Sequence, residues 1–430
     1  MDWRRHIARY GDGWFPGEPW LRWSFLAFFV LAAVLRFWNL AQLPFTHDEL
    51  SALMRIYPTL DGTVRKGVIE LDTHPPGVQV FEWAWTKVFG TSEAAVKFPF
   101  ILLAVLALFP LYRFALAWTS VGTALVSTAL LACLQYTVLY AQIARPYAIG
   151  FFTTAVLADQ LTRYLAFERR RNLAWAVVAA VACGYVHHFA LLLAGIMVAS
   201  VFLLLRPALR KTYLIACAIM LLCYAPNGPI FFKQLGHGGL GNWLPPPDHD
   251  WIGNYLAWIL HFSLPLMVLV GAVLVHGLLR SFGKERVNGP AVWLLPFWGL
   301  APLVIGYTYS IWRAPVLQYS LLLFSFPYLL VWMFAGQRHV GRSLSLGAAA
   351  LIAIVAATTL FTVRQHHLVF ADSPYAAMVR VAEAELRSAD ADHTLILFDA
   401  PRPQVEFHLR RKGLTNDPAI QWPSELSPAA

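Results

Sequence analysis

The chain has 430 residues, of which 58% are hydrophobic and only 13% are charged. A soluble protein carries about 25% charged residues, roughly twice this share. The apolar residues occur in blocks that can cross a bilayer, which takes about 20 residues each. The composition therefore excludes an ordinary soluble enzyme and predicts an all-α polytopic membrane protein.

The net charge of +9 does not indicate a nucleic-acid partner, because the basic residues lie in short loops between apolar blocks. These loops alternate along the chain, which is the pattern that orients membrane proteins with their basic side in the cytoplasm. The basic groups are Arg4, Arg5 and Arg9; Arg169 to Arg171; Arg206, Arg210 and Lys211; Arg280, Lys284 and Arg286; and Arg338 with Arg342. The pattern predicts a protein of the cell inner (cytoplasmic) membrane with a cytoplasmic N-terminus.

Hydropathy predicts about eleven transmembrane helices, which together form a membrane domain over residues 1–362 and leave an extracytoplasmic tail over 363–430. The expected spans are 22–40, 95–117, 120–139, 146–165, 172–188, 189–206, 212–230, 253–279, 290–310, 318–335 and 343–362. In the tail, the pattern of residues 375–386 predicts a helix and that of residues 394–398 predicts a strand. The tail is therefore expected to form a small α/β unit.

The acidic pair Asp48-Glu49 follows the first span directly, at the start of a long loop over 41–94. Carboxylates at the mouth of a span are costly unless they have a role. A partly desolvated carboxylate there can act as a general base. The alternative is a helix N-terminus, with Thr46 or Asp48 as cap and Glu49 in the first turn. The rest of the loop is expected to form short helices on the membrane surface.

Further polar groups fall on the same predicted extracytoplasmic side. His74 heads the rigid sequence His-Pro-Pro-Gly, where it can bind a phosphate or brace the loop. Arg145 can hold a phosphate through its planar guanidinium or reach to the interface as a snorkelling side chain. His187 and His188 are candidates for a cavity or a metal site, although an interface pair is the simpler interpretation.

Several of these motifs resemble a known family when they are taken in order. Thr46-His47-Asp48-Glu49 resembles the Asp-Glu element after the first span of protein O-mannosyltransferases and of the bacterial aminoarabinose transferases that modify lipid A. Asp72 to Gly77 is similar to their His-Pro-Pro element, and Gln142 to Tyr147 is similar to their Ala-Arg-Pro-Tyr junction. His187 to Ala190 and Trp243-Leu244-Pro245 resemble two weaker landmarks.

The resemblance implies the C-type glycosyltransferase fold and transfer of a sugar, with inversion, from a polyprenyl phosphate on the extracytoplasmic face. It implies that Asp48 is catalytic, with Glu49 beside it. The donor phosphate is expected at His74, Arg145 and Tyr147. Family members often carry Arg-Tyr where this chain has Gln318-Tyr319, so nearby Arg313 is a further candidate for the phosphate. His47, His187, His188 and Trp243 are candidates for an acceptor site or cavity.

The hypothesis is therefore a polyprenyl-phosphate-sugar-dependent hexosyl- or pentosyltransferase whose acceptor is a lipid, a glycan or a protein. No certain cofactor or metal is indicated, although a divalent cation could share the charge on the phosphate. The alternatives are a transporter or flippase of lipid-linked sugars and a polysaccharide polymerase or ligase. Transporters place coupling charges near the bilayer midplane and often show repeats, whereas these acids lie at a span mouth.

Overall fold

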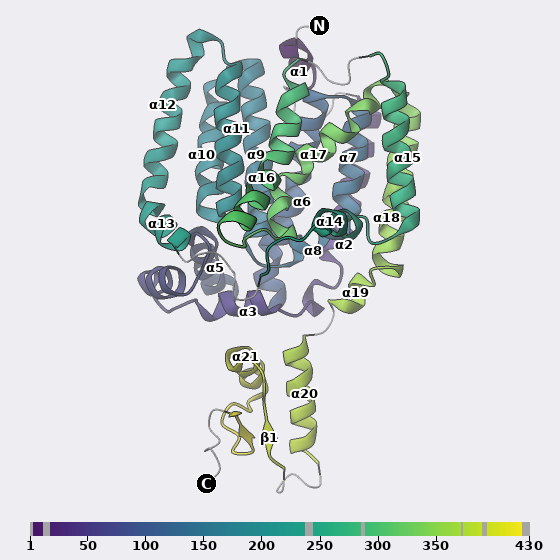
Figure 1. The fold of residues 1–430 in the computed structure, drawn as a ribbon. Coiled ribbons are helices and arrows are strands. Elements are labelled where there is room, and N and C mark those ends of the chain that lie inside the picture. Colours follow the sequence, from purple (N-terminus) through teal and green to yellow (C-terminus); the bar gives the residue numbers. More distant parts are fainter. Residues whose placement is uncertain are drawn as a thin grey trace.

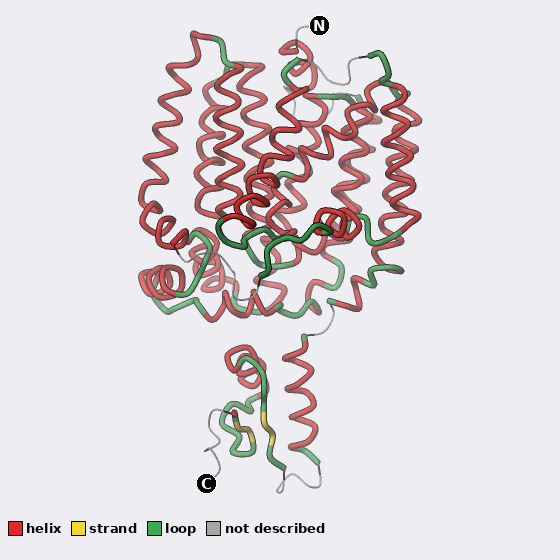
Figure 2. The backbone as a smooth tube through the Cα atoms, viewed as in Figure 1, coloured by secondary structure: helices red, strands yellow, loops and turns green. Residues whose placement is uncertain are grey.

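The computed structural model is a bundle of helices with a small tail at one end, and the N-terminus lies at the opposite end from the tail (Figure 1). The structure describes residues 3–11, 18–236, 244–284, 289–370, 373–388 and 394–423. Helices dominate these residues, and the two short strands lie in the tail (Figure 2). This agrees with the all-α class predicted from the sequence.

The bundle is built from long helices that run between its two ends. They are α2 (Pro19–Phe37), α6 (Glu93–Trp118), α7 (Val121–Cys133), α9 (Pro146–Phe167), α10 (Arg170–Val186), α11 (His188–Leu204), α12 (Pro207–Tyr224), α15 (Leu264–Arg280), α16 (Ala291–Trp312) and α18 (Arg342–Thr362). Shorter elements at the bundle's ends and breaks are α1 (Trp3–Gly11), α8 (Gln135–Gln142), η3 (Ala225–Asn227), α13 (Gly228–Gly236), α14 (Trp251–Ile259), η4 (Tyr319–Phe324), α17 (Phe326–Met333), η5 (Phe334–His339) and α19 (His366–Val369).

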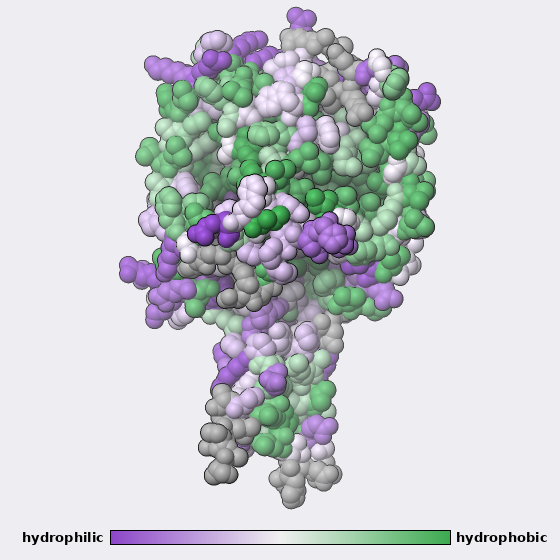
Figure 3. Space-filling view, in the orientation of Figure 1, coloured by the Kyte–Doolittle hydropathy of each residue, from purple (hydrophilic) through white to green (hydrophobic). Residues whose placement is uncertain are grey.

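Hydrophobic side chains form a belt around the bundle, and hydrophilic side chains gather at both of its ends (Figure 3). Within the described residues, five helices are long and apolar enough to cross a membrane, or seven if each of two bent helix pairs counts as one span. Large apolar side chains such as Leu221, Leu222 and Ile354 are exposed on this belt, as expected of a surface that faces lipid. The chain is therefore a multi-pass membrane protein, and the count of eleven spans stays a prediction.

Three of the expected spans are interrupted. Between α7 and α8 the chain bends by 52° at Leu134, and between α14 and α15 it bends by 94°. At the second bend His261 and Phe262 take left-handed backbone conformations. The expected span over 318–335 consists of η4, α17 and η5 in succession. Such breaks within a membrane protein are tolerated where the freed backbone groups find partners inside the protein, and His261 accepts a hydrogen bond from the backbone N–H of Gln135.

The first long loop covers the end of the bundle that faces the tail (Figure 1). It contains η1 (Leu40–Gln42), α3 (His47–Met54), α4 (Leu60–Gly62), the π-helical segment η2 (Thr63–Glu70) and α5 (Pro76–Phe89). Pro76 at the first position of α5 suits a helix start, because its missing N–H is not needed there. A Cβ on Gly77 would lie 2.5 Å from the carbonyl oxygen of Tyr185, so only glycine lets α5 pack this closely on α10.

The tail contains α20 (Pro374–Leu386), β1 (Ile396–Leu397), α21 (Arg402–Lys412) and β2 (Ile420–Gln421), and the two strands pair in parallel. Its small core includes Val379, Val405 and Trp422. The tail contacts the loop through α21, where Gln404 donates a hydrogen bond to the Ser51 hydroxyl at 3.2 Å and Arg411 pairs with Glu93. The tail is therefore docked on α3, the helix that carries the acidic pair.

Candidate active site

The start of α3 is fixed by a capping box. The Thr46 hydroxyl accepts a hydrogen bond from the backbone N–H of Glu49 at 3.4 Å, and the Glu49 carboxylate accepts one from the backbone N–H of Thr46 at 2.8 Å. These reciprocal bonds satisfy two N–H groups that a helix start leaves without partners. The helix-cap interpretation of this motif is thus correct for Glu49, and it places Asp48 at the second position of the first turn.

Glu49 is buried and fully engaged by its neighbours. The Lys97 ammonium lies 2.6 and 2.7 Å from its two carboxylate oxygens, and the backbone N–H of Ala144 donates to it at 2.7 Å. Lys97 also donates to the carbonyl oxygen of Gln142 at 3.0 Å. The pair ties α3 to α6 and to the junction between α8 and α9. These partners hold the Glu49 carboxylate in a fixed position.

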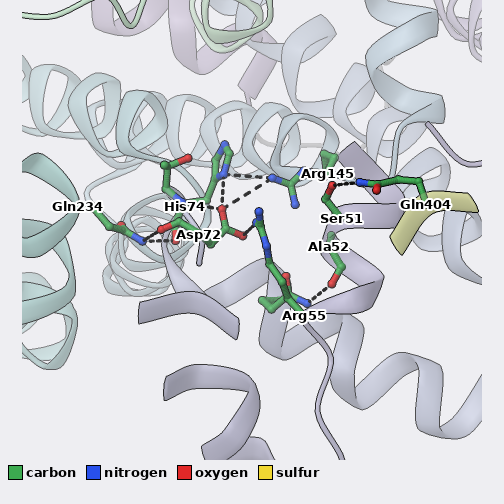
Figure 4. A network of polar contacts seen from close by, with 10 residues as sticks. Ser51, Ala52, Arg55, Asp72, His74, Arg145, Gln234 and Gln404 are labelled. Atoms are coloured by element: carbon green, nitrogen blue, oxygen red, sulfur yellow. Dashed lines mark hydrogen bonds and ion pairs between the residues drawn. The ribbon is translucent and has the colours of Figure 1, made fainter. Parts of the chain in front are cut away.

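A second buried carboxylate, Asp72, gathers several cationic groups around it (Figure 4). Arg55 lies 2.9 Å from one of its oxygens, and Nδ1 of His74 lies 2.9 Å from the other. Arg145 approaches that second oxygen to 3.9 Å and Nδ1 of His74 to 3.2 Å. Burial alone would raise the pKa of Asp72, but the bond to His74 and the nearby cations hold it well below its ordinary value. Asp72 is therefore an anion that organises a cationic cluster.

Arg145 is placed by its own sequence. As the residue before Pro146 it takes an extended conformation, so its side chain leaves the chain just before α9 begins. Its side chain is 8% exposed, and its Nε–H has no hydrogen-bond partner within the described residues. Burial alone would lower the pKa of Arg145, yet nearby acidic groups, led by Asp72 and including Asp48, raise it. The guanidinium stays charged and keeps one donor unused.

The cluster extends to the ends of α10 and α13. The Gln234 amide donates to the carbonyl oxygens of His74 at 2.7 Å and of Asp72 at 3.2 Å, and its own oxygen lies 2.9 Å from Nε2 of His188. The His187 ring packs edge-on against the His74 ring, with centroids 5.2 Å apart. Burial holds the pKa of His187 well below its ordinary value, so this ring is neutral at pH 7.

A third buried acid, Glu82 on α5, lies near the same groups. Its side chain is buried, and one carboxylate oxygen has no hydrogen-bond partner among the described residues. Burial, opposed in part by the charge of Arg145, raises the pKa of Glu82 to about 8. At neutral pH this carboxyl group is therefore largely protonated, and it does not neutralise Arg145.

The other predicted site residues are distributed as follows. Asp48 and His47 are exposed, and the Asp48 carboxylate has no hydrogen bond or ion pair in the described part of the chain. Tyr147 is buried, with its ring 4.9 Å from that of Tyr140. Arg313 is exposed at the end of α16 and makes no hydrogen bond or ion pair with the Asp72 cluster among the described residues, so the structure does not bring it to Arg145. Trp243 lies outside the described residues.

The sequence interpretation missed three residues of this site. Lys97 lies inside an apolar span, and a lone charge there is itself a signal of function or of a buried partner. Gln234 precedes a glycine-rich stretch and carries no such signal. Arg55 also carries no such signal in the sequence. It reaches Asp72 only because α3 ends at Met54 and η2 packs back against the end of this helix. The packing is close, since a Cβ on Gly67 would lie 2.3 Å from the Arg55 carbonyl oxygen.

No group of three or more histidine, cysteine, aspartate or glutamate side chains within the described ranges is arranged to hold a metal ion. His74, His187 and His188 come close together, but their nitrogens are directed to Asp72, to a backbone N–H and to Gln234. The donor set of the cluster is instead made of N–H groups, which suits an oxyanion.

Comparison with known proteins agrees with this geometry. Residues 73–230 match the family model described as dolichyl-phosphate-mannose-protein mannosyltransferase. No curated protein matches the chain significantly in sequence. The crystal structure of apo ArnT from Cupriavidus metallidurans aligns with a TM-score of 0.60 at 12% identity, over 90% of this chain and 84% of that one. The same protein bound to undecaprenyl phosphate aligns with a TM-score of 0.51 at 13% identity over the same shares.

These matches show the fold and a likeness to a family over part of the chain. At this low identity the structural likeness shows the fold, and the fold is that of ArnT. Together with the family model, it confirms the predicted resemblance to C-type membrane glycosyltransferases of the protein O-mannosyltransferase and aminoarabinose-transferase type.

Proposed function

We propose that the chain is an integral membrane glycosyltransferase that moves a sugar, with inversion, from a polyprenyl phosphate to a hydroxyl group of an acceptor. The observation that supports this best is the pairing of an unengaged carboxylate, Asp48, with a cluster whose cations exceed its anions. Arg55 and Arg145 flank the single carboxylate of Asp72, and Glu82 adds little negative charge at pH 7. Such a cluster favours an anion, and ArnT has been crystallised with undecaprenyl phosphate.

In the reaction the acceptor oxygen attacks the anomeric carbon while the bond from that carbon to the phosphate oxygen breaks. The acceptor proton passes to Asp48, and the electron pair of the broken bond leaves with the polyprenyl phosphate. The leaving oxygen gains negative charge, so donors that are already oriented toward it lower the barrier. Arg145 provides such a donor in its unused Nε–H. His74 and Tyr147 complete the proposed phosphate site, and His47 lies on the acceptor side.

We propose that this end of the bundle, with the tail, faces the periplasm or another extracytoplasmic space, and that the N-terminus is cytoplasmic. The basic groups Arg169 to Arg171, Arg206 and Arg210 lie at turns of the opposite end, as the positive-inside pattern requires. We also propose the division into a membrane domain over 1–362 and a tail over 363–430. A polyprenyl chain then stays in the bilayer while its phosphate reaches Arg145 at the interface.

The experiment supplies purified full-length protein in nanodiscs with radiolabelled polyprenyl-phosphate donors that differ in their sugar, namely mannose, glucose and aminoarabinose. Release of polyprenyl phosphate is measured in wild type and in Asp48→Asn. The proposal expects release with at least one donor, without any gradient across the membrane, and its loss in Asp48→Asn. Wild-type protein that releases no polyprenyl phosphate from any donor, but moves lipid-linked sugars between leaflets, would establish a flippase instead.

A further inference from the structure

A cavity of about 270 Å³ lies beside the first turn of α3. It is lined by the segment before α3, by the end of α8 with Ile143, by Lys97 of α6, and by described residues of the segment that leads from the membrane bundle into the tail. His47 and Tyr375 close one wall, where Nδ1 of His47 lies 2.9 Å from the Tyr375 hydroxyl. The start of the tail therefore forms part of the cavity wall.

The cavity adjoins the proposed reaction centre. Thr46 and His47 line it, and Asp48 is the next residue of the same helical turn. Ile143 lines it as well, two residues before Arg145 of the phosphate site. Asp48 and Arg145 do not themselves line the cavity, but their near neighbours in the chain do, so a group held there lies close to both segments. An acceptor is expected in such a place.

The charge of the cavity narrows the class of that acceptor. Among the described residues, Lys97 is the one lining residue with a permanent positive charge, and both oxygens of Glu49 already neutralise it at 2.6 and 2.7 Å. The remaining polar lining in the described part of the chain is made of hydroxyl, imidazole and amide groups, such as Tyr375 and Gln142, between apolar side chains such as Phe370. These described lining residues leave no cation to pair with an acceptor phosphate, so the cavity suits a neutral group that offers hydroxyls.

The size of the cavity narrows the class of acceptor further. Pockets for drug-sized ligands have volumes of about 300–1,000 Å³, and this cavity lies just below that range. It accommodates one ring-sized group with its substituents. The Phe45 and Phe370 side chains offer apolar surface for the C–H faces of such a ring, and Tyr375 and His47 offer hydrogen bonds for its edge.

We propose that this cavity is the acceptor site, that its ligand is a neutral sugar headgroup, and that Tyr375 of the tail is a binding residue for it. The inference rests on the proposed function. One hydroxyl of the bound sugar is the nucleophile, and its proton passes to Asp48 as its oxygen bonds to the donor's anomeric carbon. The tail thereby determines which acceptor is glycosylated, while the membrane bundle determines which donor is used.

The test uses the full-length protein in nanodiscs and a donor that the wild type turns over. Octyl glucoside below its micellar concentration is the neutral acceptor probe, and its 6-phosphate and a serine-containing peptide are the alternatives. Two rates are followed, transfer to the probe and hydrolysis of the donor by water. Tyr375→Phe removes one hydroxyl group, and Tyr375→Ala removes the side chain that forms part of the cavity wall. Val381→Ala is the matched control, because Val381 is on the same helix, is 63% exposed and does not line the cavity.

We expect transfer to octyl glucoside, and a ratio of transfer to hydrolysis that falls about fivefold in Tyr375→Phe, as for the loss of one hydrogen bond. Tyr375→Ala should lower the ratio further, through a higher KM for the probe, and Val381→Ala should leave it unchanged. An unchanged ratio in both Tyr375 variants overturns the proposal, as does transfer only to the phosphorylated probe or the peptide. Wild-type protein that neither transfers nor hydrolyses any donor contradicts the proposed function itself.

Discussion

Two buried carboxylates, Glu49 and Asp72, lie at the same end of the bundle and differ in how their charge is balanced. Glu49 has one cation, Lys97, and backbone N–H groups from Thr46 and Ala144. Asp72 has two guanidinium groups and an imidazole within 4 Å. Glu49 and Lys97 form a closed pair, in which the two charges balance each other and fix the local geometry. The residues around Asp72 form an open cluster, in which cations exceed anions, so that an anion from outside can complete it. Glu49 and Lys97 thus hold the structure together, and the groups around Asp72 are those that we propose to bind substrate.

Asp48 belongs neither to the closed pair nor to the open cluster. We expect its loss to have the largest effect on sugar transfer. Asp48→Asn keeps the size of the side chain and removes the base, so transfer should fall by roughly 10²- to 10⁴-fold. Because no other side chain depends on Asp48 for a hydrogen bond or ion pair in the described residues, the unfolding temperature should not change. Turnover and thermal unfolding of the purified variant check both statements. Near-normal turnover would remove Asp48 from the mechanism.

Breaking the closed pair of Glu49 and Lys97 should lower the free energy of unfolding. Lys97→Met leaves the Glu49 carboxylate buried without its cation, which costs about 3–5 kcal/mol of unfolding free energy for a pair that is 2% and 0% exposed. The double variant Glu49→Gln/Lys97→Met removes both charges and should recover much of that loss. Denaturant unfolding in mild detergent measures both. A single variant that loses less than about 1 kcal/mol would match an exposed pair and contradict the role given to Lys97.

Removing a cation from the open cluster should act on donor binding instead. Arg55→Gln takes away the cation that lies 2.9 Å from Asp72, so the affinity for polyprenyl phosphate should fall about tenfold, as for one charge-assisted hydrogen bond. Thermal unfolding should change less than in Lys97→Met, because Arg55 is partly exposed. Affinity is measured by titration in nanodiscs. An Arg55→Gln protein that unfolds as readily as Lys97→Met but binds donor normally would place Arg55 in the scaffold.

A fourth expected effect concerns Glu82 and the dependence of stability on pH. Its pKa rises from an ordinary 4.5 to about 8 on folding, so between these values the folded chain binds more protons than the unfolded chain. Stability from this group is therefore complete below about pH 4.5 and is lost as the pH rises toward 8. Glu82→Gln imitates the neutral acid, so its unfolding temperature should fall less from pH 5 to pH 8 than that of the wild type. Equal pH profiles would show that Glu82 is ionised in the folded protein.

The sequence predicted the membrane class from hydropathy, whereas a shared place for His74 and Arg145, which are 71 residues apart, was expected from the family resemblance. Hydropathy reports burial in a bilayer directly, and the Pro residues next to His74 and Arg145 fix their backbones without help from the rest of the fold. The partners of Glu49 could not be predicted, because Lys97 is 48 residues away and the contact depends on how α3 crosses α6. The same holds for Gln234, whose contact with His74 spans 160 residues.

The expected span over 318–335 shows that hydropathy does not predict where a helix breaks. It is mostly apolar, yet the chain forms η4, α17 and η5 there in place of one straight helix. Apolar content reports only that a segment avoids water, and Pro327 with the packing of Gly299 against Leu329 decides its path. In the tail, the expected strand over 394–398 contains the short β1, and the helix α21 that docks on α3 was not anticipated because its pattern is mostly polar.

The central claim is that the open cluster around Arg145 holds the donor phosphate, and direct binding of undecaprenyl phosphate tests it. The dissociation constant is measured in nanodiscs for wild type, Arg145→Lys and Arg145→Ala, with Arg280→Ala as control because Arg280 is exposed in the last turn of α15. Lysine keeps the charge but loses the planar pair of donors, so Arg145→Lys should weaken binding about tenfold and Arg145→Ala more. Unchanged affinity in both Arg145 variants, with loss in Arg313→Ala, would contradict the account and move the phosphate site to the end of α16.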